Sequence, residues 1–277
     1  METTTDRRHT GPEIGRPLSA PLAIWPACIC TVLLFLVFIS RLDNVLFIGL
    51  HSLAGEPGGA YWAHVTILGD GLVAAVVLLP FVRRRPDILF ALVVASLVGI
   101  LVTHGIKPWL DTPRPPKVLA GSTLLDVLGP AHKSRSFPSG HAMTAFMIAG
   151  IVAMNVPKGW RLVCVLVATT VAVSRVVVGV HWPTDVLAGA ACGWVAAVVG
   201  VAVAHRWRWG SSRPAAIVWG GILIAGGVVM VFVDHTGYTT AFRFQQILAI
   251  ESLSWGIAEY VPLLRASRAK ATHVVSP

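Results

Sequence analysis

Two histidines stand beside residues that suit them for reactions at phosphorus. His181 is followed four residues later by Asp185 in "HWPTD", and His141 ends the tetrapeptide "PSGH" directly before an apolar run. An imidazole can attack phosphorus, and a carboxylate on one ring nitrogen fixes the tautomer and leaves the other nitrogen free. A second histidine can protonate a leaving oxygen. We therefore expect His181 to act as a nucleophile oriented by Asp185, with His141 as a general acid.

Cations and a helix start accompany these histidines. Lys107, Arg114 and Arg175 lie near the ends of apolar runs. Three cations can hold the non-bridging oxygens of a phosphate, and arginine can bind two oxygens at once. Ser139 and Gly140 open an expected helix whose free N–H groups can bind an anion, and glycine lets the backbone approach closely. These five residues are expected to bind phosphate.

Each of these residues also has an ordinary structural explanation. Lys107 and Arg114 can extend toward lipid headgroups, His141 can cap a helix, and Asp185 can favour a helix N-terminus through its charge. Those explanations predict no particular spacing between the residues. A phosphate site does predict one, and it requires all of them at one membrane face.

The composition predicts an all-α, polytopic membrane bundle to position this site. Of 277 residues, 55% are hydrophobic and only 13% are charged, and the mean hydropathy is +0.72. The net charge of +9 fits lysines and arginines in cytoplasmic loops and near anionic lipid. No basic stretch is interleaved with aromatics, so a nucleic-acid partner is not expected. The four cysteines fall in apolar runs and are interpreted as small buried residues, so neither a disulfide framework nor a metal site is expected.

Seven apolar runs approach the roughly 20 residues that a membrane-spanning helix needs. They cover residues 21–40, 61–81, 87–106, 141–156, 162–180, 185–204 and 215–233. Asp70 lies inside the second run, where an acid is either functional or paired with a loop cation. Gly189 and Gly193 predict close helix packing in the sixth. Residues 245–264 carry Glu251 and Glu259; we favour an amphipathic helix at the membrane surface over an eighth span, because two carboxylates in lipid are costly.

Basic loops predict the orientation of the bundle. Clusters follow the second, fourth and sixth runs, and the N-terminal tail at 1–20 carries three arginines. With these on the cytoplasmic side, the loops holding the expected site face outward. The first run lacks a cleavage-site pattern and is expected to remain as a span. Seven spans would leave the basic C-terminus outside, and this conflict supports an eighth.

Three motifs resemble those of the type-2 phosphatidic acid phosphatase superfamily of integral membrane lipid phosphatases. They are "KPWLDTPRP" at 107–115, "PSGH" at 138–141 and "SRVVVGVHWPTD" at 174–185, complete and in order. The resemblance covers roughly 61–204. It implies a six-helix core, here residues 21–204, and leaves 205–277 as a C-terminal extension of open role. It also implies a phosphohistidine on His181, no metal and no cofactor.

The resemblance implies a phosphatase that acts on a lipid phosphate within the bilayer, at the outer face of a plasma (inner) membrane. Polyprenyl diphosphate, phosphatidylglycerophosphate, phosphatidic acid and lipid A phosphates are candidate substrates. Two alternatives remain at this point. A phosphotransferase would pass the same phosphoryl group to a second lipid, and a lipid transporter would use the cations only to hold a headgroup. The sequence leaves the oligomeric state open.

Overall fold

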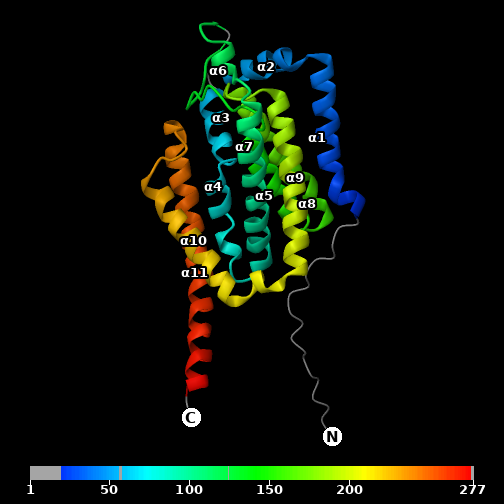
Figure 1. The fold of residues 1–277 in the computed structure, drawn as a ribbon. Helices are drawn as coiled ribbons and strands as arrows, with labels where there is room; N and C mark the ends of the chain where they lie inside the picture. Colours follow the sequence, from blue (N-terminus) through cyan, green and yellow to red (C-terminus); the bar gives the residue numbers. More distant parts are fainter. Residues whose placement is uncertain (1–19, 56–57, 124, 276–277) are drawn as a thin grey trace.

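The computed structural model describes residues 20–55, 58–123 and 125–275, and every regular element in these ranges is helical. The longer helices stand side by side in an upright bundle (Figure 1), which confirms the predicted all-α fold. The predicted tail at 1–20 lies outside the described residues, apart from Ala20. The α-helices are α1 (Ala20–Ser40), α2 (Asp43–His51), α3 (Gly58–Ile67), α4 (Gly71–Val76), α5 (Pro86–Leu110), α6 (Pro115–Val118), α7 (Gly140–Ala153), α8 (Lys158–Val177), α9 (Pro183–Arg206), α10 (Arg213–Phe232) and α11 (Phe242–Val275). Short 3₁₀ helices are η1 (Ser52–Ala54), η2 (Leu79–Phe81), η3 (Arg208–Ser211) and η4 (Thr239–Ala241).

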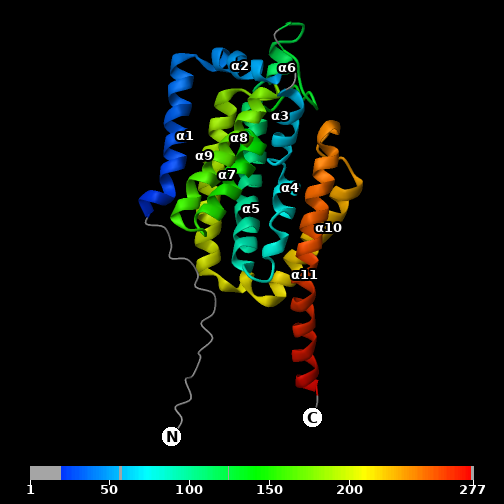
Figure 2. The ribbon, with the colours of Figure 1, turned by 180° about the vertical axis from the view of Figure 1, so that it is seen from behind.

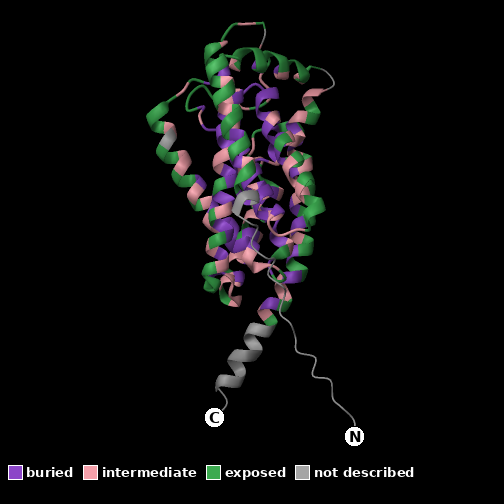
Figure 3. Ribbon diagram, turned by 90° about the vertical axis from the view of Figure 1, so that its right-hand side faces the viewer, coloured by how far each residue is buried: buried purple, intermediate pink, exposed green. Residues whose placement is uncertain are grey.

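The outer surface of the bundle is apolar. Phe38, Ile39, Leu101 and Phe232 are each more than 70% exposed, whereas Arg175 is 4% exposed. Figure 3 shows the buried residues gathered along the inner faces of the helices. Large exposed apolar surface around a partly polar interior is the distribution expected in lipid. The chain is therefore an integral membrane protein. All four cysteines are free, and Cys28 is exposed on α1, contrary to the expected burial.

Six described helices are long and apolar enough to cross a membrane, or seven if α3 and α4 together count as one span. α7 has 14 residues, short of the 20 or so that a full span needs. The expected span at 61–81 is bent by 61° between α3 and α4. A Cβ on Gly69 would lie 3.0 Å from the Cβ of His141, so only glycine fits this approach of α7. Asp70 then caps α4 through the N–H groups of Leu72 and Val73.

Residues 245–264, for which a surface helix was favoured over an eighth span, lie in a helix whose length and composition favour the eighth-span alternative. Thr239–Arg265 is long and apolar enough to cross a membrane, and α11 runs upright beside α10 (Figure 1). Glu259 is 5% exposed and pairs with Arg83 and Arg84 at 2.6 and 2.9 Å, which compensates its charge. Glu251 stays exposed. The arrangement fits the alternative of an eighth span.

The core that carries the site is formed by α5, α7 and α9. Figure 2 shows them between α1 on one side and α10 with α11 on the other. A Cβ on Gly189 or Gly193 would lie within 2.4 Å of the backbone oxygens of Ser139 or Met143. The close packing predicted from these glycines is therefore confirmed, and it fixes the start of α7 against α9.

Candidate active site

The expected site residues meet at one end of the bundle, near α2 and α6 (Figure 1). A cavity of about 150 Å³ lies there, between the end of α5, the start of α7 and the α8–α9 turn. Ser139 and Asp185, the other two expected residues, lie behind this lining. Six of the eight expected residues line it: Lys107, Arg114, Gly140, His141, Arg175 and His181.

His181 is held by Asp185 on one side and faces a cation on the other. Its Nδ1 lies 3.2 Å from Oδ2 of Asp185, and its Nε2 lies 3.2 Å from Nη1 of Arg114. Because the guanidinium can only donate, Nε2 is the acceptor and Nδ1 carries the proton. The side chains of His181 and Asp185 are each 3% exposed. The lone pair of Nε2 therefore points to where Arg114 would hold an anion.

Ser136, which the sequence analysis did not single out, completes the hydrogen-bonding of Asp185. Its hydroxyl donates to Oδ2 of Asp185 and lies 3.4 Å from Nδ1 of His181. The N–H of Trp182 donates to the same oxygen at 2.8 Å. Ser136 is fully buried. Its place two residues before "PSGH" is the only signal in the sequence that could have indicated it.

The two arginines are fixed by neutral partners. Arg114 donates from Nε to the Ser134 carbonyl at 3.0 Å and from Nη1 to the Val180 carbonyl at 3.2 Å. Arg175 donates from Nη1 to Thr66 Oγ1 at 2.6 Å and to the Tyr238 hydroxyl at 3.0 Å. Thr66 and Tyr238 were also missed, because nothing local in the sequence relates them to Arg175.

The cations of this cavity are not neutralised by carboxylates. In the part of the chain that the structure describes, the arginines found in ion pairs are Arg83, Arg84 and Arg85, far from the cavity. Lys107, Arg114 and Arg175 form no such pair there. Asp185 contacts Ser136, His181 and Trp182 instead. Three close positive charges, none of them in an ion pair, form a site that favours a multiply charged anion.

The start of α7 adds backbone donors to this cavity. Ser139 caps the helix by accepting from the Ala142 N–H, and its own N–H donates to the Asp185 carbonyl at 3.0 Å. Gly140 and His141 form the first turn and line the cavity. A helix begins with N–H groups that have no partner inside the helix, so this turn can bind an anion. The contact with Asp185 also fixes α7 relative to His181.

Burial lowers the pKa of His181 well below its ordinary value of 6.5, and the positive charges of Arg114 and Arg175 lower it further. The ring is therefore neutral near pH 7. A neutral imidazole with a proton on Nδ1 leaves Nε2 unprotonated, with a lone pair that accepts from Arg114 in this structure. The described residues contain no group of three or more His, Cys, Asp or Glu arranged to hold a metal ion.

A larger apolar cavity of about 480 Å³ adjoins the first, and the two share Gly140 and His141. It extends from the α3–α4 break between α5 and α7, along Leu92, Ile100 and Met147. Another apolar cavity, of about 500 Å³, lies beside α1 and is lined by Phe35, Trp182 and Asp185. It shares no lining residue with the 150 Å³ cavity among those described. His141 therefore stands between a cationic cavity and an apolar one.

Comparison with known proteins covers the same part of the chain. Residues 88–210 match the PAP2 superfamily. The chain is 33% identical over 142 residues to the undecaprenyl-diphosphatase of Sulfolobus acidocaldarius. This match covers 51% of this chain and 63% of that protein. It is 31% identical over 140 residues to phosphatidylglycerophosphatase B of Bacillus subtilis, covering 47% and 60%. The matches thus span less than two thirds of each relative. The crystal structure of Aquifex aeolicus LpxE superposes with a TM-score of 0.50 at 26% identity, over 58% of this chain and 95% of that one.

Proposed function

We propose, because residues 88–210 match the PAP2 superfamily as their motifs predicted, that this chain is a membrane phosphatase acting on a lipid phosphate or diphosphate. One observation carries the proposal. His181 is oriented by Asp185 so that Nε2 faces a cavity lined by three cations that no carboxylate pairs among the described residues. A site built only to hold a headgroup, as in a transporter, has no need of an oriented, neutral imidazole.

The first step follows from this arrangement. Lys107, Arg114, Arg175 and the first turn of α7 bind the non-bridging oxygens and the charge that develops on them. Nε2 of His181 attacks phosphorus while the bond from phosphorus to the leaving oxygen breaks. Burial and the nearby cations lower the pKa of His141 well below 6.5, and the negative charge of the bound phosphate opposes this and favours its protonated form. Protonated His141 gives the leaving oxygen its proton, and the phosphoryl group stays on His181.

The second step returns the enzyme to its starting state. A water molecule attacks the phosphohistidine, and His141, now without its proton, accepts one from that water. The bond from phosphorus to Nε2 breaks, and inorganic phosphate leaves. Asp185 holds the Nδ1 proton through both steps, and Ser136 fixes Asp185.

The substrate tail is proposed to lie in the 480 Å³ apolar cavity, because that cavity meets the cationic one at His141. A lipid whose leaving oxygen is at this boundary, an ester oxygen in a monophosphate or the bridging oxygen in a diphosphate, puts that oxygen next to the general acid. The names of the two relatives indicate undecaprenyl diphosphate and phosphatidylglycerophosphate as their substrates. Both lipids fit this description. Phosphatidic acid and lipid A phosphates share its chemistry.

The site is proposed to face the outer, periplasmic side of the plasma membrane. Arg83, Arg84 and Arg85 lie at the opposite end of the bundle, after η2. Basic residues concentrate on the cytoplasmic side, so that end is assigned to the cytoplasm. Reaction of cysteines placed near Arg84 and near His132 with an impermeant thiol reagent on intact cells tests this assignment.

The enzyme assay uses purified full-length protein in detergent with EDTA and a panel of lipid phosphates and diphosphates. We expect release of inorganic phosphate, and a loss on the order of 10⁴-fold or more in His181→Ala. Acid-labile phosphate trapped on the wild-type chain, and absent from His181→Ala, would identify the intermediate. Full activity in His181→Ala would refute the assigned nucleophile. Transfer of phosphate to a second lipid, without free phosphate, would indicate a phosphotransferase.

A further inference from the structure

The turn between α10 and α11, residues 234–241, reaches the cationic cavity from outside the region that matches the family. That match ends at residue 210. Thr236 and Tyr238 nevertheless line the cavity together with Arg114, Arg175 and His181. The C-terminal extension is thus in contact with the residues proposed to bind phosphate.

Tyr238 contacts Arg175 in two ways. Its hydroxyl accepts a hydrogen bond from Nη1 at 3.0 Å, and its ring centroid lies 5.9 Å from the guanidinium carbon. Thr66 accepts from the same Nη1 at 2.6 Å. Tyr238 is 4% exposed and Thr66 is fully buried. Nη1 is therefore held by two buried hydroxyls, one from the core and one from the extension.

The rest of the Arg175 guanidinium is left for a ligand. Its Nε is buried and has no hydrogen-bond partner among the described residues. A buried donor without a partner is costly, and a phosphate oxygen would satisfy it. Because the guanidinium is planar, fixing Nη1 also fixes the directions of the other N–H groups. The two hydroxyls therefore determine how Arg175 faces the cavity.

The turn is anchored so that Tyr238 has little freedom to move. His235 pairs with Asp70 at 2.9 Å, which joins the turn to the α3–α4 break. A Cβ on Gly129 would lie 2.5 Å from the ring of Tyr238, so the loop before α7 packs directly against it. Gln245 donates to the carbonyls of Met230 and Val233 at 2.7 and 2.9 Å, which closes the base of the turn.

We propose that Tyr238 is a positioning residue for Arg175, and that the α10–α11 turn is thereby a working part of the phosphate site. The proposal rests on the function proposed above. It assigns a role to the C-terminal extension, which lies outside the family match. The extension orients Arg175, one of the three cations, toward phosphate.

The test compares Tyr238→Phe with Tyr260→Phe in the full-length protein. Tyr260 is the matched control, because its hydroxyl donates to the Ile217 carbonyl at 2.8 Å within the same extension, between α11 and α10. Both variants keep the ring and lose one hydroxyl. We expect Tyr238→Phe to bind inorganic phosphate and orthovanadate about 5- to 10-fold more weakly and to raise KM by a similar factor. Tyr260→Phe should match the wild type in both measurements.

A further variant, Thr66→Val, removes the other acceptor of Nη1, and Thr66→Ser restores its hydroxyl. Phosphate binding should weaken in the valine variant and recover in the serine variant.

Equal phosphate binding by Tyr238→Phe and wild type would overturn the proposal. Binding is measured without turnover, so this result is independent of whether the wild type hydrolyses a lipid. Absence of hydrolysis with intact phosphate binding would instead refute the proposed function.

Discussion

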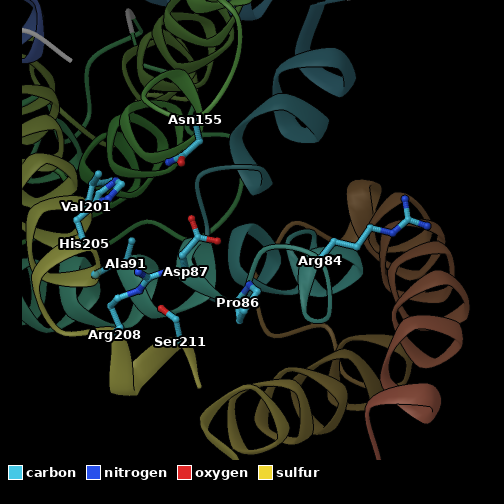
Figure 4. A pocket seen from close by; sticks show the side chains of 10 residues that line it. Arg84, Pro86, Asp87, Ala91, Asn155, Val201, His205, Arg208 and Ser211 are labelled. Atoms are coloured by element: carbon cyan, nitrogen blue, oxygen red, sulfur yellow. The ribbon is translucent and has the colours of Figure 1, made fainter. Parts of the chain in front are cut away.

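The bundle has a polar cavity at each end, and arginine and histidine line both of them. The one opposite the proposed active site holds about 370 Å³ and is lined by arginine, histidine, aspartate, asparagine and serine (Figure 4). It is larger than the 150 Å³ cavity at the other end. Neither size nor the presence of arginine and histidine would identify the active site.

The two ends differ in what the cations contact. Arg85 donates from Nε and Nη2 to the two carboxylate oxygens of Asp87, at 3.0 and 2.7 Å, and also bonds Asn155. Arg84 lines the cavity (Figure 4) and pairs with Glu259 at 2.9 Å. At the active-site end, by contrast, Asp185 is bound to His181. Arg208 also lines the 370 Å³ cavity and is in no ion pair among the described residues, so the contrast concerns Arg84 and Arg85. Paired cations stabilise the fold, whereas unpaired cations can bind an anion.

The difference between the two ends predicts the largest contrast in kcat for substitutions of Asp185 and Asp87. Asp185→Asn should lower kcat on the order of 10³- to 10⁴-fold, because an amide can present N–H to His181 and favour the tautomer whose Nε2 is protonated. Asp87→Asn should leave kcat within about 2-fold and lower the melting temperature. Initial rates of phosphate release and thermal melts of both variants measure this. Near-normal activity in Asp185→Asn would show that His181 does not depend on it.

The arginines give the next contrast. Arg175→Lys keeps the charge but loses the planar guanidinium and its paired N–H donors. We expect kcat/KM to fall about 10²-fold. Arg85→Lys loses the same geometry toward Asp87 and should reduce stability with little change in kcat/KM. The measurements are kcat/KM on one lipid phosphate and the melting temperature. Equal losses of activity in the two variants would contradict the distinction between paired and unpaired cations.

The sequence predicted those parts of the site that are encoded locally. Asp185 lies four residues after His181, and "PSGH" places a cap and a glycine at the start of α7. Such features follow from short spacing, so they could be inferred before any fold was known. The apolar runs likewise predicted the positions of most helices, because each needs only its own length and hydropathy.

The parts that were missed depend on contacts between distant residues. Ser136 is 49 positions from Asp185, and Thr66 and Tyr238 are 109 and 63 positions from Arg175. Hydroxyl residues are common in helices and loops. Nothing in the sequence distinguishes Thr66 or Tyr238, and the only signal for Ser136 is its place two residues before "PSGH". The preference for a surface helix at 245–264 has a related cause. Glu259 seemed too costly for a span because Arg83 and Arg84, which pair with it, lie about 175 positions earlier in the chain.

Glu259 provides a smaller effect, confined to stability. Glu259→Gln removes the charge that Arg83 and Arg84 contact at 2.6 and 2.9 Å, while the side chain keeps its size. Both arginines are partly exposed, so the expected fall in melting temperature is only about 2–4 °C. kcat should stay within about 2-fold of wild type. A loss of activity without a change in melting temperature would mean that this end of the bundle also acts in catalysis.

The smallest effect concerns protonation of His181 near neutral pH. Burial and the unpaired charges of Arg114 and Arg175 lower the pKa of His181 well below 6.5, so its ring should stay neutral as the pH falls from about 8 to 6.5. Protonation, which removes the Nε2 lone pair, should occur only below that range. NMR titration of the chain with labelled histidines, assigned by loss of the His181 signal in His181→Ala, measures this. Arg114→Gln removes one positive charge, so the midpoint should move to higher pH. Arg85→Gln, at the other end, should leave it unchanged. A wild-type midpoint at or above 6.5 would mean that Asp185 outweighs burial and the cations, and that the unpaired charges do not set the state of the nucleophile.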